Sequence, residues 1–147
     1  MKTIVKIQQL PLDDMMSLRH DVFVVEQNVP IEEELCDDES LFVHIGLYIN
    51  SAIVAYCRLL IDTDTVHIGR VSVSKSMRRQ GMGRQIMNIA HDYAKDVGCK
   101  ISKLSAQLHA LDFYLNLNYV SYGDQYMDAG IPHISMLKYL TPNNLTY

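Results

Sequence analysis

The strongest constraint on the fold is a strand–loop–helix–strand unit between residues 65 and 105. Residues 65–73 are rich in β-branched side chains and predict a strand. A loop with two glycines follows, and then apolar residues recur at the spacing of one helix face: Ile86, Ala90, Tyr93, Ala94 and Val97. Gly98 is suited to end this helix with a positive φ, and residues 100–105 predict the next strand. This order of elements favours a parallel or splayed join between the two strands.

The remaining elements favour antiparallel pairing. Residues 42–49 and 53–61 flank Asn50-Ser51, which predicts a hairpin leading into the strand at 65–73. Asp13 or Asp14 is expected to cap a helix that carries Met15, Leu18, Arg19, Val22 and Phe23 at helical spacing. Further elements are expected at these places: strands at 4–7, 119–122 and 133–138, a short helix at 110–117 ended by Asn118, and a loop containing Gly130-Ile131-Pro132. The sequence therefore predicts an α/β (α+β) fold with a mixed, mostly antiparallel sheet of six to seven strands, flanked by helices.

Composition and charge narrow the class of protein. The chain has 147 residues and no linker or internal repeat, so a single domain over residues 1–147 is expected. A formal charge of -4 argues against nucleic-acid and membrane-surface partners. The three cysteines are far apart and include no C-x-x-C pair, which favours free thiols and no metal site. The N-terminus lacks the apolar run of a signal peptide and no stretch is long enough to span a membrane, so a cytoplasmic location is expected.

The glycine-containing loop, Arg78-Arg79-Gln80-Gly81-Met82-Gly83, has the features of an anion site. A helix start offers unpaired N–H groups and a positive partial charge, and glycines let a phosphate approach the backbone. Arg78, Arg79 and Arg84 add charge suited to phosphate oxygens. The alternative is a solvated basic loop. The loop fits neither the P-loop, which needs Gly-Lys-Ser/Thr, nor the G-x-G-x-x-G dinucleotide loop, because Ile86 stands at the third glycine.

The same loop resembles the Q/R-x-x-G-x-G/A pyrophosphate loop of the GNAT N-acetyltransferases. Ala110-Leu111-Asp112-Phe113-Tyr114 resembles the A-x-x-F-Y motif of that family, in the usual order and separation. More narrowly, residues 19–27, 104–107 and 130–133 are similar to the ElaA-like branch. The resemblance covers nearly the whole chain and implies the GNAT fold, with a splayed central strand pair, and acetyl-CoA as co-substrate.

The resemblance also implies which residues contact acetyl-CoA. The backbone of the strand Val71-Ser72-Val73 is expected to pair with the pantetheine arm, and backbone N–H groups of Arg79 to Arg84 are expected to hold the pyrophosphate. The full set of implied cofactor residues is Val71, Ser72, Val73, Arg78, Arg79, Gln80, Gly81, Met82, Gly83, Arg84, Gln107, Asp112, Phe113 and Tyr114.

Tyr114 is the expected general acid, because in the family a tyrosine at this position donates a proton to the leaving thiolate. The alternative is that Tyr114 packs in the core like Phe113. Glu26 is the preferred base, with His44, His67, the acidic stretch at Asp37-Asp38 or a water chain left open.

The residues expected to line the acceptor site are Arg19, Glu26, Asp38, His44 and His133. The acidic run at residues 31–40 reads as a loop, either solvated or attracting a cationic amine by its field. The expected function is transfer of an acetyl group to the primary amine of a small molecule. A catalytically inactive acyl-CoA-binding regulatory module is the alternative, and a homodimer is common in the family.

Overall fold

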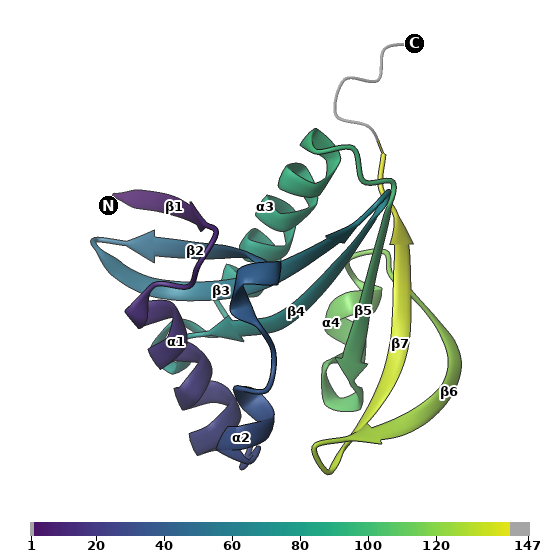
Figure 1. Cartoon of the computed structure of the whole chain (residues 1–147), viewed down its shortest axis with the longest axis horizontal. Coiled ribbons are helices and arrows are strands. Elements are labelled where there is room, and N and C mark those ends of the chain that lie inside the picture. Colours follow the sequence, from purple (N-terminus) through teal and green to yellow (C-terminus); the bar gives the residue numbers. More distant parts are fainter. Residues whose placement is uncertain (1, 142–147) are drawn as a thin grey trace.

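The computed structural model describes residues 2–141 and contains a seven-stranded sheet in the order β1-β2-β3-β4-β5-β7-β6 (Figure 1). The strands are β1 (Thr3–Gln8), β2 (Val43–Ile49), β3 (Ala52–Asp62), β4 (Thr65–Val73), β5 (Ile101–Gln107), β6 (Val120–Asp128) and β7 (Ile131–Tyr139). The helices are α1 (Asp13–Arg19), η1 (His20–Glu26), α2 (Ile31–Glu34), η2 (Glu39–Leu41), η3 (Lys75–Met77), α3 (Met82–Asp96), η4 (Leu108–Ala110) and α4 (Leu111–Leu115). The predicted mixed α/β fold is confirmed.

The join between β4 and β5 is the feature that creates a site. These strands are the parallel pair of the sheet and match over three residue pairs, ending at His67 and Lys103. Beyond that point they diverge, and Figure 1 shows the two halves of the sheet opening like a V. Every other neighbouring pair is antiparallel. The splayed join expected from the sequence is therefore present.

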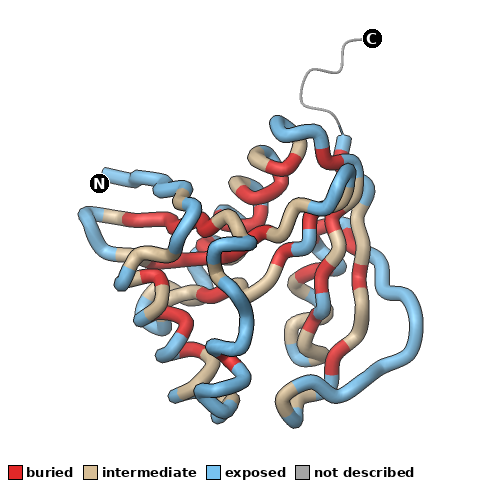
Figure 2. Tube along the Cα trace, in the orientation of Figure 1, coloured by how far each residue is buried: buried red, intermediate tan, exposed pale blue. Residues whose placement is uncertain are grey.

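Helices cover the two faces of the sheet. The main core lies between the sheet and α3, where Ile86, Ala90 and Ala94 are fully buried against β2, β3 and β4. Figure 2 shows this buried stripe along α3. Val97 was expected to complete the stripe but is exposed, because the helix ends at Asp96 and Gly98 turns the chain with φ +96°. On the opposite face α1 packs on β3 through Met15 and Leu18.

Three sequence predictions need correction. Leu12, not an aspartate, occupies the N-cap of α1, and no side chain caps that helix. The acidic stretch is not wholly a loop, because α2 and η2 form there where arginines neutralise Glu34 and Glu39. The segment before residue 133 is mainly strand, since β6 and β7 meet at a tight turn through Ala129 and Gly130, both with positive φ.

No helix among residues 2–141 is long and apolar enough to cross a membrane. The same residues contain no group of three or more His, Cys, Asp and Glu side chains arranged to hold a metal ion. Cys36, Cys57 and Cys99 are free thiols.

Candidate active site

The start of α3 is an open anion cradle. Gly81 is its N-cap with φ +81°, and Arg79 also has a positive φ of 63°. No side chain caps the helix, and the backbone bond from Gln85 N–H to Gly81 is the first to close a turn. The N–H groups of Met82, Gly83 and Arg84 therefore remain available at the positive end of a helix of 15 residues. This geometry suits a pyrophosphate.

The three arginines near this cradle are not equivalent. Arg78 donates two hydrogen bonds to the carboxylate of Glu26, at 2.7 and 2.8 Å, and its Nε donates to the Val73 carbonyl. Arg79 and Arg84 are exposed and form no ion pair with any residue between 2 and 141. Arg78 thus anchors the loop to the end of η1, while Arg79 and Arg84 are free to meet an anion.

The Glu26 carboxylate, predicted as the base, is held by an arginine. Its bonds from Arg78, with a smaller contribution from Lys75, lower the pKa of the carboxyl group. A carboxylate with a lowered pKa and a guanidinium partner is a weak proton acceptor. Glu26 also lies outside the set of residues that line the main cavity of the site. The structure thus gives no support to Glu26 as base and shows its carboxylate paired with Arg78, in the loop before α3.

The outer part of β4 presents backbone groups that no strand uses. After the last pair, His67 with Lys103, the edge of β4 that faces β5 has no strand partner. One extra residue in β4 forms a bulge, because Tyr56 pairs with Ser72 whereas Arg58 pairs with Gly69. Arg70 sits in the bulge with φ +53°, an unusual conformation for a non-glycine residue. The free edge at Val71 to Val73 can pair with an extended ligand arm as a strand would.

Tyr114 stands beside this free edge. A Cβ at Gly83 would lie 3.1 Å from the Phe113 ring, so the start of α3 and α4 pack closely. Tyr114 is buried, with its ring edge-on to those of Phe113 and Tyr119. Burial raises the pKa of the Tyr114 hydroxyl, which keeps it protonated. That hydroxyl has no hydrogen-bond partner within residues 2–141, and Tyr114 lines the cavity.

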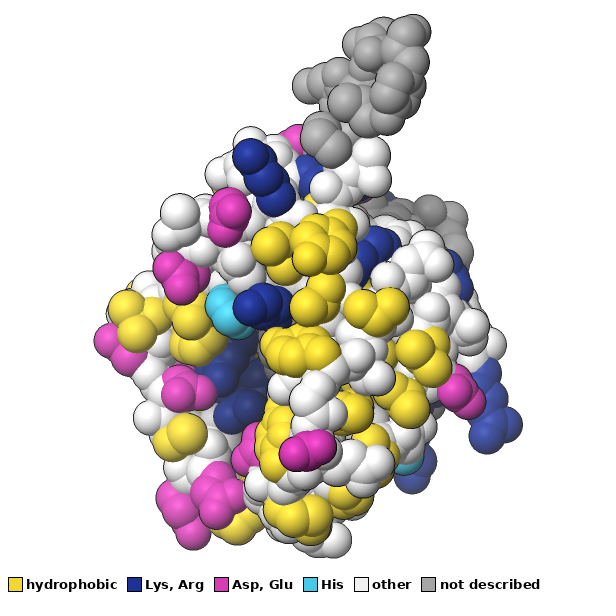
Figure 3. Space-filling view, turned by 90° about the vertical axis from the view of Figure 1, so that its right-hand side faces the viewer, with side chains coloured by type: hydrophobic (Ala, Val, Ile, Leu, Met, Phe, Trp, Pro, Cys, Tyr) yellow, Lys and Arg dark blue, Asp and Glu magenta, His cyan; other side chains and the backbone are white. Residues whose placement is uncertain are grey.

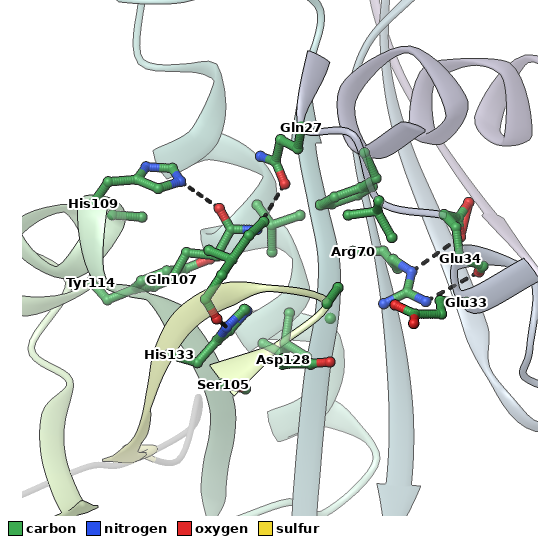
Figure 4. A pocket seen from close by; sticks show the side chains of 18 residues that line it. Gln27, Glu33, Glu34, Arg70, Ser105, Gln107, His109, Tyr114, Asp128 and His133 are labelled. Atoms are coloured by element: carbon green, nitrogen blue, oxygen red, sulfur yellow. Dashed lines mark hydrogen bonds and ion pairs between the residues drawn. The ribbon is translucent and has the colours of Figure 1, made fainter. Parts of the chain in front are cut away.

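The cavity has a volume of about 280 Å³ and opens between the diverging strands. Figure 4 shows Arg70 and Glu34 on one side and Tyr114, Gln107 and His133 on the other. The lining residues come from η1 to α2, β4, β5 to α4, and the β6–β7 turn: Phe23, Gln27, Val29, Glu33, Glu34, Ile68, Gly69, Arg70, Val71, Ser105, Gln107, His109, Ala110, Tyr114, Asp128, Ala129, Ile131 and His133.

His133 has a fixed tautomer in this cavity. Its Nδ1 lies 2.7 Å from the carbonyl oxygen of Ile131. Because a carbonyl can only accept, Nδ1 carries a proton, and in the neutral ring the lone pair is on Nε2. The ring stacks on Tyr126 with centroids 6.0 Å apart, and Tyr126 is bonded to Ser105. Nε2 has no hydrogen-bond partner within residues 2–141, and His133 lines the cavity.

Gln107 bridges the two sides of the cavity. Its amide nitrogen donates to Gln27 Oε1 at 2.8 Å, and its amide oxygen accepts from His109 Nε2. The side chain expected to contact the cofactor is thus already engaged at both ends. It closes the cavity by joining β5 to the end of η1.

The other predicted acceptor residues lie elsewhere. Arg19 is fully buried and pairs with Glu34 and Glu39, so it supports the cavity from behind. His44 is also fully buried: it donates to the Glu39 carbonyl and accepts from the Tyr56 hydroxyl, and burial lowers its pKa. Asp38 is exposed and caps η2 through Ser40. Arg19 and His44 are therefore corrected as substrate contacts, because both side chains are fully buried. Asp38 lies outside the cavity, and its contact with substrate stays a prediction.

Sequence reasoning missed most of the polar lining. Arg70, with Nε 3.2 Å from Glu34 Oε2, and the exposed carboxylates of Glu33 and Asp128 were not singled out for this site. Glu34 joins two arginines, Arg19 and Arg70, across 15 and 36 residues of sequence. No local motif marks such a pairing.

The chain is similar to known proteins in sequence and in structure. Residues 12–140 match the family model described as Acetyltransferase (GNAT) domain. The YjcF protein of Bacillus subtilis (strain 168), named an uncharacterized N-acetyltransferase, is 36% identical over 139 residues, which cover 94% of this chain and 99% of YjcF. Protein ElaA of Escherichia coli (strain K12) is 35% identical over 136 residues, covering 84% of each chain. The crystal structure of an acyl-CoA N-acyltransferase from Pseudomonas aeruginosa is similar with a TM-score of 0.77, 30% identity and coverage of 93% of this chain and 99% of that one. The chain belongs to the GNAT acetyltransferase family.

Proposed function

We propose that the protein transfers an acetyl group from acetyl-CoA directly to the primary amine of a small molecule. One observation carries the proposal: Tyr114, whose hydroxyl has no hydrogen-bond partner within residues 2–141, and His133, whose Nε2 has none there, line the same cavity. Val71, on the free edge of β4, lines that cavity, and the open start of α3 follows the same strand in the chain.

The donor is held mainly by backbone. Residues 71–73 would pair with the pantetheine arm, and the N–H groups of Met82 to Arg84, with Arg79 and Arg84, would hold the pyrophosphate. Gly83 and Phe113 keep the cradle and α4 together. When bound, acetyl-CoA supplies an acetyl thioester whose sulfur departs as a thiolate.

Tyr114 is the proposed general acid. Its raised pKa keeps the hydroxyl protonated at neutral pH, so it can donate to developing negative charge on the leaving sulfur. His133 is the proposed general base in place of Glu26. An alkylammonium must lose a proton before it attacks, and Nε2 of His133 can accept that proton while Nδ1 stays bonded to Ile131.

The overall activity is tested by incubating the protein with acetyl-CoA and a panel of primary amines while measuring release of free thiol. We expect release that depends on the amine, with the product mass increased by one acetyl group. Acetyl-CoA should also raise the unfolding temperature, because a ligand that binds the native state stabilises it. Stabilisation without thiol release for any amine would overturn the proposal.

The assignment of His133 is tested with two acceptors. His133→Gln is expected to lower kcat for hexylamine by about a hundredfold, a typical contribution of a general base. The loss should be much smaller for 2,2,2-trifluoroethylamine, which is already neutral at pH 7 and needs no base. An equal loss for both amines would show that His133 acts in packing rather than in proton transfer.

A further inference from the structure

A second hollow adjoins the cavity on the same face of the sheet. It has a volume of about 440 Å³ and lies where β4 and β5 begin to diverge. Ile68, Gly69 and Ser105 line both spaces, so the cavity and this hollow form one continuous groove. In Figure 3 a hollow is visible with Lys and Arg side chains inside it, acidic side chains on one rim and apolar ones on the other.

The two ends of the groove differ in charge. The cavity end contains the exposed carboxylates of Glu33 and Asp128, whereas Arg70 there is bonded to Glu34. Neither Glu33 nor Asp128 forms an ion pair within residues 2–141. This end therefore favours a cationic amine close to Tyr114 and His133.

The far end of the groove is basic. His67 and Lys103 are register partners at the last pair of β4 and β5, and both line the hollow. Lys103 forms no ion pair with any residue of the described chain. Arg58 also lines this end, but it is neutralised by Glu39 and Asp37 and stacks on Phe42 at 3.9 Å. Lys103 is therefore the unpaired charge at this end of the groove.

We propose that the acceptor is a primary amine that also carries an anionic group, and that Lys103, assisted by His67, binds that group. This inference rests on the proposed acetyl transfer and names its substrate class. The amine lies at the carboxylate end, and the anionic tail passes Gly69 and Ser105 to reach Lys103. The groove is acidic at the cavity end and basic at the Lys103 end. A dication would therefore place its second positive charge against Lys103 and be repelled.

A set of six-carbon amines tests whether the groove prefers an acceptor with an anionic tail. Hexylamine, 6-aminohexanoate, 6-aminohexyl phosphate and 1,6-diaminohexane share a reacting amine and differ only in the tail. We expect kcat/KM to be about fivefold higher for an anionic tail than for hexylamine, the size expected of one partly exposed charge pair. The diamine should be the poorest acceptor. The carboxylate and phosphate compounds tell which anion the site prefers.

Variants of Lys103 link the preference to the residue. Lys103→Met should remove the preference for an anionic tail over hexylamine, and Lys103→Glu should reverse it in favour of the diamine. Lys100→Met, which removes an exposed charge just before β5 and outside the groove, should change nothing. Unfolding temperatures of all variants control for folding.

The outcomes separate the two proposals. Thiol release with equal kcat/KM for all four tails, or a Lys103→Met variant that keeps the preference, would overturn the inference and leave the proposed function in place. Absence of thiol release with every acceptor would overturn the proposed function and the inference with it.

Discussion

The donor half and the acceptor half of the site are built in different ways. The donor half, from Val71 to Arg84 with Phe113 and Tyr114, uses backbone groups of one strand end and one helix start. The acceptor half uses side chains from η1 to α2, the β4 bulge, the end of β5 and the β6–β7 turn. A backbone site binds what every donor molecule shares, whereas a side-chain site can change with each substitution. In the proposed function, specificity for the amine therefore resides in the acceptor half.

Tyr114→Phe should produce the largest effect on the donor half. It removes the hydroxyl that faces the cavity and keeps the ring that packs on Phe113 and Tyr119. We expect kcat to fall by about a hundredfold to ten-thousandfold, while the Kd for acetyl-CoA stays within about twofold. Steady-state kinetics and calorimetric titration measure both. An unchanged kcat would mean that Tyr114 serves the core alone, and the donor half would then lack a proton donor.

The same contrast explains what the sequence predicted. The helix start at Gly81, the strand 65–73 and the splayed join were predicted because each depends on neighbouring residues and on local periodicity. The acceptor half was largely missed, and only His133 among its five predicted residues lines the cavity. Arg19 and His44 were taken as substrate contacts although both are fully buried. Whether a polar side chain faces a ligand or a buried partner depends on contacts such as Arg19 with Glu34, which are distant in sequence.

The supporting layers of the two halves differ in charge as well. Glu34, bonded to Arg19 and Arg70, forms an ionic support for the acceptor half. The donor half is supported by a hydrogen-bonded chain of uncharged side chains. In it the Tyr119 hydroxyl lies 2.6 Å from His91 Nε2 and 2.7 Å from Ser102 Oγ. This uncharged chain is more sensitive to mild acid than the ionic support around Glu34, because burial lowers the pKa of His91 to about 4.

Acidification should therefore destabilise the protein through His91 before carboxylates contribute. The unfolded state binds a proton near pH 6.5 and the folded state only near pH 4, so stability falls as pH decreases between these values. We expect a loss of about 2 kcal/mol between pH 7 and pH 5, measured by chemical denaturation. His91→Gln should flatten most of this slope, and His44, whose pKa is also lowered by burial, contributes the remainder. The pKa values of Glu26, Asp38 and Glu39 are lowered, which places their effects at more acidic pH. An unchanged slope in His91→Gln would assign the loss to another group.

Two variants compare Arg79, which has no ion-pair partner within residues 2–141, with Arg78, which is paired with Glu26. Arg79→Gln should weaken acetyl-CoA binding about tenfold, because a charge-assisted bond to phosphate is lost. Arg78→Gln should weaken it only about twofold, because that guanidinium already binds Glu26. Titration at two salt concentrations measures both, with the Arg79 effect decreasing at high salt. The reverse order of effects would place Arg78 at the pyrophosphate.

Glu26→Gln should give the smallest change and decides which half of the site Glu26 serves. Its carboxylate lies outside the cavity and is held by Arg78, so kcat for hexylamine should change by less than about twofold. The pair is partly exposed, and its loss should cost less than about 1 kcal/mol of stability. The KM for acetyl-CoA should rise slightly, since the loop loses its anchor. A fall in kcat for hexylamine as large as that of His133→Gln, but not for 2,2,2-trifluoroethylamine, would identify Glu26 as the base. Glu26, at the end of η1, would then belong to the acceptor half of the site.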